Sequence, residues 1–325
     1  MPLPPQLQRA IEQETGRHPS KALSQAAAEL SEAYRTGHLG SGAFLTTELH
    51  RLAYAAVRLP ATFAAVRAVL AAVRRLLPER PLTSLLDLGA GPGTVGWAAT
   101  EIFAGLEAAT LIEADTGLIA LGKALAQTGE HALLEQARWV QGDLRGLTAF
   151  TPCDLVVSSY ALGELGEEAA SAVLRAAWAA TSQVLLVVEP GTVRGFALIR
   201  RLRDELIAVG AHLIAPCPHH EDCPLPAGDW CHFSQRLERS RLHQRLKEVA
   251  LGYEDEKFSY VAVARHPLQP APARILRHPL RHAGHTELQL CTPTGLQTVT
   301  VTRSNKAGWK EARKAEWGDE WRGGG

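Results

Sequence analysis

The chain has 325 residues, of which 46% are hydrophobic and 21% charged, with 34 acidic and 34 Lys or Arg side chains. This composition excludes a disordered chain and a small disulfide scaffold, and the length allows two or three domains with a full core. The N-terminal stretch MPLPPQLQRAIEQE has no basic segment followed by an apolar one, so we expect neither export nor a membrane partner. We therefore expect a cytoplasmic protein, in which clustered cysteines hold metal more often than they form disulfides.

Charge is unevenly distributed along the chain. Residues 81–190 carry 4 Lys or Arg against 13 Asp or Glu, whereas residues 265–314 carry 9 against only 2. The basic segment is of the kind that attracts a polyanion such as RNA. A solvated basic face would give the same pattern, and charge alone leaves the two open.

Residues 5–80 are rich in Ala, Leu, Arg and Glu at helical spacing, with breaks at GRHPS, TGHLGSG and LP. From residue 81 onward, short apolar runs alternate with helical stretches: SLLDLGAGPG, AATLIEAD, ARWVQGD, CDLVVSSYA and QVLLVVEPG. This alternation predicts an α/β fold, in which a parallel sheet has helices on both faces.

The first predicted strand ends in a glycine-rich turn. Asp87 lies near the end of the apolar run, and Gly89, Gly91 and Gly93 follow at alternate positions, where backbone can approach a ligand before a helix begins. A dinucleotide fingerprint would place its third glycine three residues after the second, which this sequence does not. The order resembles motif I of class I S-adenosylmethionine-dependent methyltransferases.

That resemblance assigns further cofactor residues at the ends of the next two strands. Glu113, 24 residues after Gly89, stands where the family has an acid that bonds the ribose hydroxyls. Asp143 stands where the family faces the adenine amine, with Leu144 beside it. The predicted cofactor set is thus Asp87, Gly89, Gly91, Gly93, Glu113, Asp143 and Leu144.

No catalytic residue can be assigned from the sequence. The Asp/Asn-Pro-Pro-aromatic signature of amine methylation is absent, because SSYALGEL stands after the fourth strand. Cys153 precedes that strand, at the end remote from the cofactor, and we expect it to be a core thiol. Residues 158–160 are expected at the mouth of the site, and Glu189 at the end of the fifth strand could face it.

Four of the five cysteines form a second candidate site. Cys217, Cys223 and Cys231 have C-x5-C-x7-C spacing, and Cys291 follows after 59 intervening residues. Zinc knuckles space their cysteines by two to four residues, so these wider intervals favour an iron–sulfur cluster with thiolates on separate irons. Zinc remains an alternative, as do unligated thiols or one histidine in place of a cysteine: His219, His220 or His232.

Seven segments carry a more specific resemblance: LAYAAVRLPATFAAV, LLDLGAGPGTVGWAA, SSYALGEL, VVEPGT, APCPHHEDCPL, DWCHFSQRLERS and GWKEARKAEWGD. Together they resemble the methyltransferase-like proteins of the small ribosomal subunit, whose mitochondrial members act in subunit assembly. The resemblance implies S-adenosylmethionine, a [4Fe-4S] cluster, contact with small-subunit ribosomal RNA, and a C-terminal oligonucleotide-binding-like β-domain.

The C-terminal sequence agrees with such a domain. Prolines 267, 270 and 272 mark a linker, and HTELQLC and LQTVTVTR flank TPTG as a predicted hairpin. A cluster that includes Cys291 would then join this hairpin to the preceding domain. Trp309, Trp317 and Trp321 alternate with basic residues, which suits stacking on RNA bases, although packing onto the β-domain would explain them equally. We also expect three arginines to contact phosphates: Arg274, Arg277 and Arg281.

The sequence thus predicts a helical region over 1–80, a methyltransferase-like domain over 81–265 with its metal loop at 216–232, and a small basic β-domain over 266–325. Two functions remain open. One is a ribosomal RNA methyltransferase; the other is an inactive factor that uses the cofactor fold as a scaffold in subunit assembly or translation.

Overall fold

The structure, a computed structural model, describes residues 2–36, 45–77 and 81–323. The N-terminal helices are α1 (Pro5–Gly16), α2 (Ser20–Thr36), α3 (Glu48–Val57) and α4 (Leu59–Arg74). Thr47 caps α3 by accepting a hydrogen bond from the His50 amide, and α4 begins with proline near its first position. Because α4 is apolar on nearly every side, it is buried between the other helices and the main sheet.

The main sheet has its strands in the order β3-β2-β1-β4-β5-β8-β6, with β7 paired to β8. The parallel strands are β1 (Ser84–Leu88), β2 (Ala108–Glu113), β3 (Arg138–Gln141), β4 (Cys153–Ser159) and β5 (Thr181–Pro190). Strand β8 (Tyr253–Ala264) is antiparallel to β5, β6 (His212–Ala215) and β7 (Phe233–Glu238). This order is that of the class I methyltransferase fold, and the predicted fold class is confirmed.

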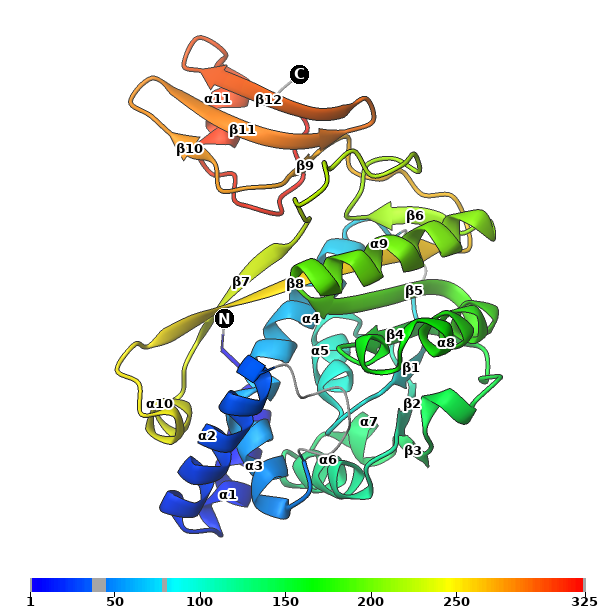
Figure 1. The fold of residues 1–325 in the computed structure, drawn as a ribbon, viewed down its shortest axis with the longest axis vertical. Helices are drawn as coiled ribbons and strands as arrows, with labels where there is room; N and C mark the ends of the chain where they lie inside the picture. Colours follow the sequence, from blue (N-terminus) through cyan, green and yellow to red (C-terminus); the bar gives the residue numbers. More distant parts are fainter. Residues whose placement is uncertain (1, 37–44, 78–80, 324–325) are drawn as a thin grey trace.

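Helices cover both faces of the sheet (Figure 1). On one face, α5 (Thr94–Ile102) and α6 (Thr116–Thr128) pack with α4 in a core that includes Leu85; short α7 (Ala132–Glu135) follows α6. On the other face, α8 (Glu167–Ala180) and α9 (Val193–Ala208) share a core with Leu86 and Leu88. Successive side chains of a strand point to opposite faces, so the leucines of β1 contribute to both cores.

The C-terminal residues form a second, antiparallel sheet beside the main one (Figure 1). Its strands are β9 (Arg274–Ile275), β10 (Leu280–Arg281), β11 (His285–Thr292) and β12 (Gly295–Thr302), followed by α11 (Lys306–Ala312). Thr292 pairs with Gly295, so β11 and β12 form the predicted hairpin. Leu288, Leu290 and Val301 pack against Trp321 in the core of this sheet.

Helix α10 (Arg241–Lys247) lies at the tip of the arm that β7 and β8 extend beyond the sheet (Figure 1). Among the described residues, no single helix is long and apolar enough to cross a membrane. Helices α3 and α4 meet such a length and composition test only when taken together across their 47° bend. The division of the chain into three regions at 80 and 265 stays a prediction.

Candidate functional site

The glycine turn follows β1 at the carboxyl edge of the sheet. Gly89, Gly91 and Gly93 all have positive φ, at 75°, 54° and 83°. A Cβ on Gly89 would lie 2.4 Å from that of Ala161, whereas one on Gly91 would meet nothing within 4 Å. The turn therefore packs tightly against the segment after β4 at Gly89 and leaves open space at Gly91, as close approach to a ligand requires.

Asp87 lies in β1 immediately before this turn and is fully buried. Neither of its carboxylate oxygens has a hydrogen-bond partner among the described residues. Burial, and to a smaller extent the charge of Glu113, raises the pKa of this carboxyl well above its usual value. A buried carboxyl without donors is suited to a cationic ligand that supplies both charge and hydrogen bonds.

Glu113 ends β2 beside the turn. One carboxylate oxygen accepts a hydrogen bond from the Gly91 amide at 2.8 Å, and the other accepts from the Asp115 amide at 2.9 Å. Burial raises the pKa of Glu113, while these two hydrogen bonds oppose the shift. Its carboxylate is thus fixed between the glycine turn and the start of α6.

The two cofactor residues predicted after β3, Leu144 and Asp143, differ in burial. Leu144 is buried, and its side chain would lie 3.8 Å from a Cβ on Gly89, so it packs beside the turn. Asp143 has a half-exposed carboxylate that pairs with Arg145 at 2.7 Å. The arginine lowers the pKa of Asp143 by hydrogen bonding. A contact between Asp143 and adenine stays a prediction.

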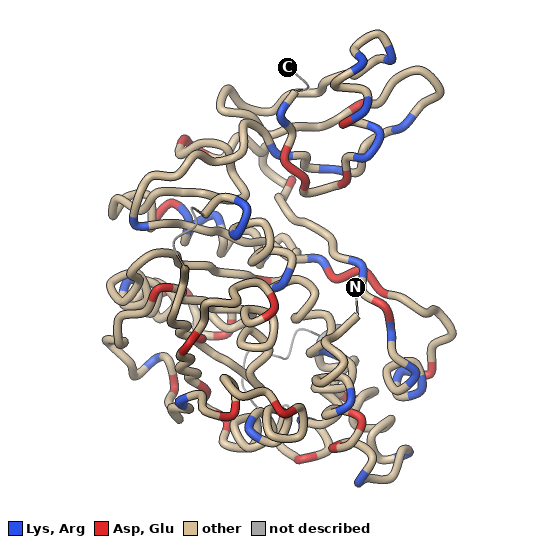
Figure 2. The backbone as a smooth tube through the Cα atoms, turned by 180° about the vertical axis from the view of Figure 1, so that it is seen from behind, with Lys and Arg blue, Asp and Glu red and all other residues tan. Residues whose placement is uncertain are grey.

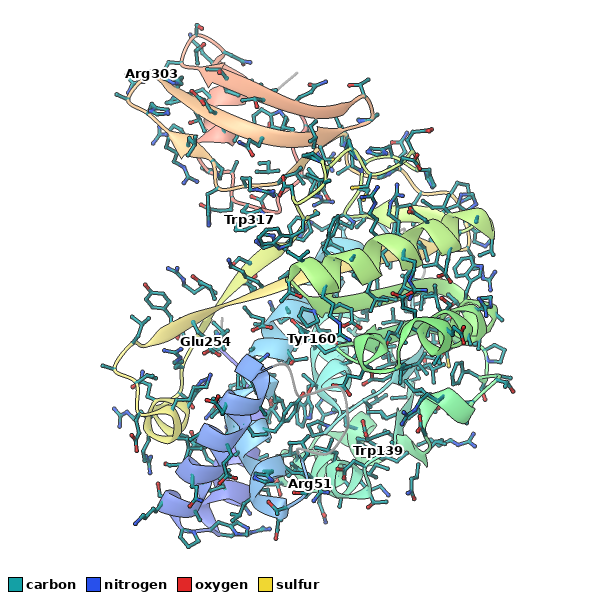
Figure 3. The ribbon with its side chains drawn as sticks, in the orientation of Figure 1. Arg51, Trp139, Tyr160, Glu254, Arg303 and Trp317 are labelled. Atoms are coloured by element: carbon teal, nitrogen blue, oxygen red, sulfur yellow. The ribbon has the colours of Figure 1, made fainter. Side chains whose placement is uncertain are left out.

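The segment after β4 offers no free base among the residues expected there. The Ser158 hydroxyl donates to the Leu88 carbonyl, and the Tyr160 hydroxyl donates to Glu256 at 2.9 Å. Burial raises the pKa of Tyr160 well above its usual value. Tyr160 also has a φ of 57°, a conformation that is uncommon for a non-glycine residue and recurs at functional sites (Figure 3).

Glu189 ends β5 and is buried, with one oxygen accepting from the Gly163 amide at 3.1 Å. Burial raises the pKa of Glu189 to about 8, so this side chain is mostly protonated at neutral pH. Cys153 is buried at the opposite end of the sheet, where β4 begins, as expected for a core thiol.

The four remaining cysteines line one cavity of about 40 Å³ between the two sheets. Cys217, Cys223 and Cys231 come from the segment that joins β6 to β7, and Cys291 comes from β11. Burial, together with the neighbouring thiols, raises the pKa of Cys291 to about 12 and that of Cys231 well above its usual value. Residues 74 positions apart in the chain thus meet in a single thiol-lined site.

The structure separates the three histidines considered as alternative ligands. The Nε2 atom of His219 lies 3.6 Å from Cys291 Sγ, and His219 also lines the cavity. His220 Nε2 accepts from the Leu213 amide. His232 stacks on Trp230 and makes an edge contact with Trp317. His219 is therefore the histidine best placed to replace a thiolate.

A protein-family model described as mitochondrial small ribosomal subunit Rsm22 matches residues 48–322. The chain belongs to the Rsm22 family. It is 30% identical to the human "Ribosome assembly protein METTL17, mitochondrial" over 294 residues, which cover 84% of this chain and 62% of the relative. It is 25% identical to the fission yeast "Rsm22-cox11 tandem protein 2, mitochondrial", with 84% of this chain and 43% of the relative covered. The chain thus spans less than two thirds of these relatives.

Solved methyltransferase structures are also similar to this Rsm22 family member. Magnesium protoporphyrin IX methyltransferase of Synechocystis, with bound S-adenosylmethionine, has a TM-score of 0.40 and 16% identity, covering 64% of this chain and 79% of that one. Precorrin-6y C5,15-methyltransferase of Geobacter metallireducens has a TM-score of 0.39 and 14% identity, covering 61% and 86%.

The comparisons correct the expected location. We expected a cytoplasmic protein because the N-terminus lacks a secretory pattern. The Rsm22 family description and the curated relatives all carry the word mitochondrial, which points to the mitochondrion rather than the cytoplasm. A secretory pattern tests for export only, so its lack could not decide between these two compartments.

The structure corrects one of the three arginines expected to contact phosphates. Arg274 is 2% exposed and donates to the carbonyls of Pro216 and Gly318. Arg277 pairs with Asp229, and Arg281 pairs with Glu316. Arg274 is therefore not available to phosphates. Arg277 is partly exposed and Arg281 exposed, so their contact with RNA stays a prediction.

The C-terminal tryptophans pack against other side chains of the protein rather than project into solvent. Trp321 is 5% exposed in the core of the second sheet, and Trp317 makes edge contacts with His232 and His278 where that sheet meets β7 (Figure 3). Trp309 is half-buried, with the Arg303 guanidinium over its ring. Packing thus explains Trp317 and Trp321. Basic residues also gather in the C-terminal region (Figure 2), and those around α11 are exposed: Arg303, Lys306, Lys310, Arg313 and Lys314.

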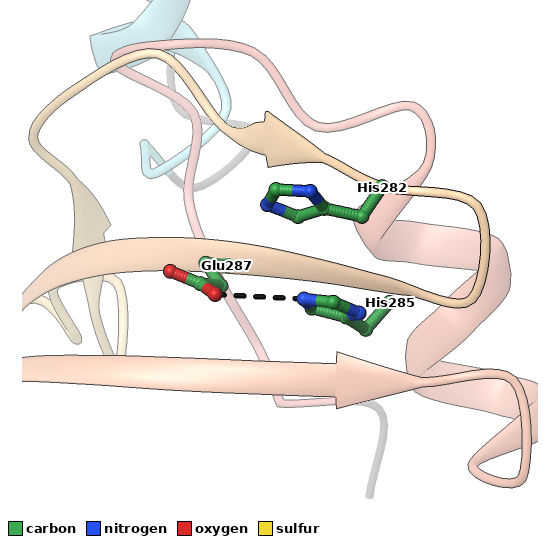
Figure 4. Close-up of side chains that lie close together, drawn as sticks. All are labelled: His282, His285 and Glu287. Carbon is green, nitrogen blue, oxygen red and sulfur yellow. Dashed lines mark ion pairs between the residues drawn. The ribbon is translucent and has the colours of Figure 1, made fainter.

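One further group of metal-binding side chains lies at the other end of β11. His282 and His285 flank the β10–β11 turn with their rings stacked at 4.4 Å, and His285 lies 3.5 Å from Glu287 (Figure 4). Among the described residues, this is the one set of three whose ligand atoms all lie within 4.8 Å of one another. All three side chains are at least partly exposed, and His285 and Cys291 lie six positions, about 20 Å of strand, apart.

Proposed function

We propose that this Rsm22 family member binds S-adenosylmethionine and a [4Fe-4S] cluster and associates with the small ribosomal subunit through its ribosomal RNA. In this proposal it acts in subunit assembly. The observation that carries it is the convergence of four cysteines from two parts of the chain on one cavity, beside a methyltransferase fold whose glycine turn is open to a ligand.

The residues present fit S-adenosylmethionine. The unpartnered carboxyl of Asp87 would receive the ammonium of the methionine part, and Glu113 would accept both ribose hydroxyls. The part of the cofactor between its ammonium and its ribose would lie in the open space at Gly91, with Leu144 packed beside the turn. When bound, the cofactor would supply an electrophilic methyl group.

The cysteine cavity fits a metal–sulfur centre larger than one ion. Three thiolates around a single tetrahedral Zn²⁺ with Zn–S bonds near 2.3 Å would lie about 3.8 Å apart. No three Cys or His ligand atoms of the cavity, all within the described residues, gather within 4.8 Å of one another. A four-iron cluster spreads its thiolates over separate irons, so the wider arrangement supports it over zinc.

Association with the ribosome rests on the family and on charge. The human and fission yeast relatives of this chain are named as mitochondrial ribosome-assembly or Rsm22 proteins. In this chain, Lys306, Lys310 and Lys314 recur every four residues on and just after α11, so they lie along one side of the helix. Such an exposed basic stripe supports contact with RNA phosphates.

A binding factor fits the site better than a nucleobase methyltransferase does. Amine methylation needs an acceptor and a stacking surface after β4, whereas Tyr160 here is held by Glu256 and Ser158 by a backbone carbonyl. Glu164, in the same segment, is the remaining acceptor: burial, with the charge of Glu113, raises its pKa to about 7. The methyltransferase alternative therefore rests on the fold, the cofactor residues and this one carboxyl.

One experiment separates the two functions. Purified protein and radiolabelled S-adenosylmethionine are incubated with small subunits that lack this protein and with their naked RNA. Subunit binding without methyl transfer supports the binding factor. Transfer that is lost with Asp87→Asn and kept with Glu107→Gln, an exposed glutamate just before β2, would instead establish the enzyme.

A further inference from the structure

Two buried arginines face the cysteine cavity. Arg203 from α9 is 4% exposed and Arg274 from β9 is 2% exposed, and both line the cavity with the four cysteines. In the pairing of β9 with β11, Arg274 lies directly opposite Cys291. Directly paired residues of neighbouring strands point to the same side, which places the guanidinium of Arg274 beside the fourth thiol.

Neutral carbonyls take most of the hydrogen bonds of these arginines. Arg203 donates to the carbonyls of His219 and Glu221, and Arg274 donates to those of Pro216 and Gly318. One nitrogen of each guanidinium, Nε of Arg203 and Nη2 of Arg274, has no partner among the described residues.

Carboxylates compensate these two charges only in part. Arg203 pairs with Asp204, the next residue of α9, whose side chain is half-exposed. Arg274 has no carboxylate within 4.0 Å among the described residues. Glu320, opposite Arg274 in an isolated β-bridge, pairs with Arg322 through one oxygen, and its other oxygen has no partner among those residues. A buried cation without a counter-charge is strongly destabilising, so we expect an anionic ligand in the cavity.

A cluster held by four cysteines has the required charge. Metal-bound cysteines are thiolates. Four thiolates around an oxidised [4Fe-4S] core of charge 2+ carry a net charge of about −2, which two arginines neutralise. The two cations also come from the two parts of the chain that the cysteines join.

We propose that Arg203 and Arg274 are the counter-charges of the metal–thiolate centre, and that Arg274 makes docking of the C-terminal sheet depend on a loaded centre. This inference rests on the proposed cluster. Reduction adds one negative charge to the cluster, and nearby cations favour it, so both arginines raise its reduction potential. Loss of the cluster leaves Arg274 buried without a counter-charge, which favours release of the sheet.

The test compares charge-keeping with charge-removing variants in anaerobically purified full-length protein. The set is Arg274→Lys, Arg274→Gln, Arg203→Lys and Arg203→Gln, with Arg239→Gln as a control, because Arg239 is a mostly buried, ion-paired arginine in the β7–β8 arm. Iron content, the midpoint potential from a redox titration followed by electron paramagnetic resonance, and hydrogen exchange of β11 and β12 are measured.

The glutamine variants are expected to shift the midpoint potential to more negative values and to speed exchange in β11 and β12. The lysine variants and the Arg239 control should stay near wild type in potential. Equal potentials in the lysine and glutamine variants of both positions, with a normal wild-type cluster, would overturn the counter-charge role. If Arg274→Gln does not fold, the midpoint potentials of Arg203→Lys and Arg203→Gln are compared in the same way. A wild-type protein without iron would instead overturn the proposed cluster itself.

Discussion

The Glu113 carboxylate accepts a hydrogen bond from the amide of Gly91, 22 residues earlier in the chain, at 2.8 Å. This contact joins the end of β2 to the glycine turn after β1. It fixes an acceptor at the edge of the open space that the turn leaves. In the proposed complex, the same carboxylate accepts the ribose hydroxyls of S-adenosylmethionine.

Replacing Glu113 with Ala is therefore expected to weaken S-adenosylmethionine binding at least about tenfold, because a hydrogen bond to a charged group contributes about 1.5–3 kcal/mol. Calorimetry measures the affinity. The matched control is Glu107→Ala, an exposed glutamate just before the same strand, which should bind as wild type does. Equal affinity for both variants would remove Glu113 from the site.

The raised pKa of Glu189 predicts that the stability of the folded protein depends on pH. Its pKa is raised by burial to about 8 in the folded protein, whereas an unfolded glutamate titrates near 4.3. The folded state thus binds the extra proton between these values, so this group lowers stability as pH rises from about 4.3 to 8.

The Glu189→Gln variant removes this titration while keeping an oxygen that can accept from the Gly163 amide. Urea unfolding should show little difference from wild type near pH 4. At pH 8 the variant should be more stable by at least about 1 kcal/mol, since each unit of pKa shift corresponds to about 1.4 kcal/mol. A variant less stable than wild type at pH 8 would show that Glu189 is ionised and favourably paired.

The basic stripe on α11 predicts a salt effect on RNA binding. If Lys306, Lys310 and Lys314 contact three phosphates, changing all three to Glu should lower the slope of log affinity against log salt by at least about 2 for small-subunit RNA. The control changes three exposed basic residues elsewhere on the chain to Glu: Lys21, Lys123 and Arg138. The same loss of slope in both variants would assign the effect to net charge rather than to α11.

Local patterns in the sequence predicted the parts of the structure that depend on neighbouring residues. The strand-end positions of Asp87 and Glu113 follow from apolar runs and a glycine turn, and the β11–β12 hairpin follows from two alternating runs around TPTG. These features need only a few adjacent residues to form. The four cysteines also line one cavity, whereas their role as metal ligands stays a prediction.

Features that depend on distant partners were not predictable. Arg274 looked like a phosphate ligand because its partners, the carbonyls of Pro216 and Gly318, lie 58 and 44 residues away. The hydrogen bond from Tyr160 to Glu256 could not be predicted either, because the two residues are 96 positions apart. Spacing likewise could not distinguish His219 from His220, because only the folded cavity shows which ring faces Cys291.

The proposed cluster is the central claim, and metal analysis of the anaerobically purified protein tests it most directly. The wild type should be brown, with about four irons and four sulfides per chain. Cys291→Ser should lose this metal, whereas Cys153→Ser, a buried cysteine outside the cavity, should keep it. A colourless wild type with one zinc per chain, or a Cys291→Ser variant with full iron content, would contradict the account.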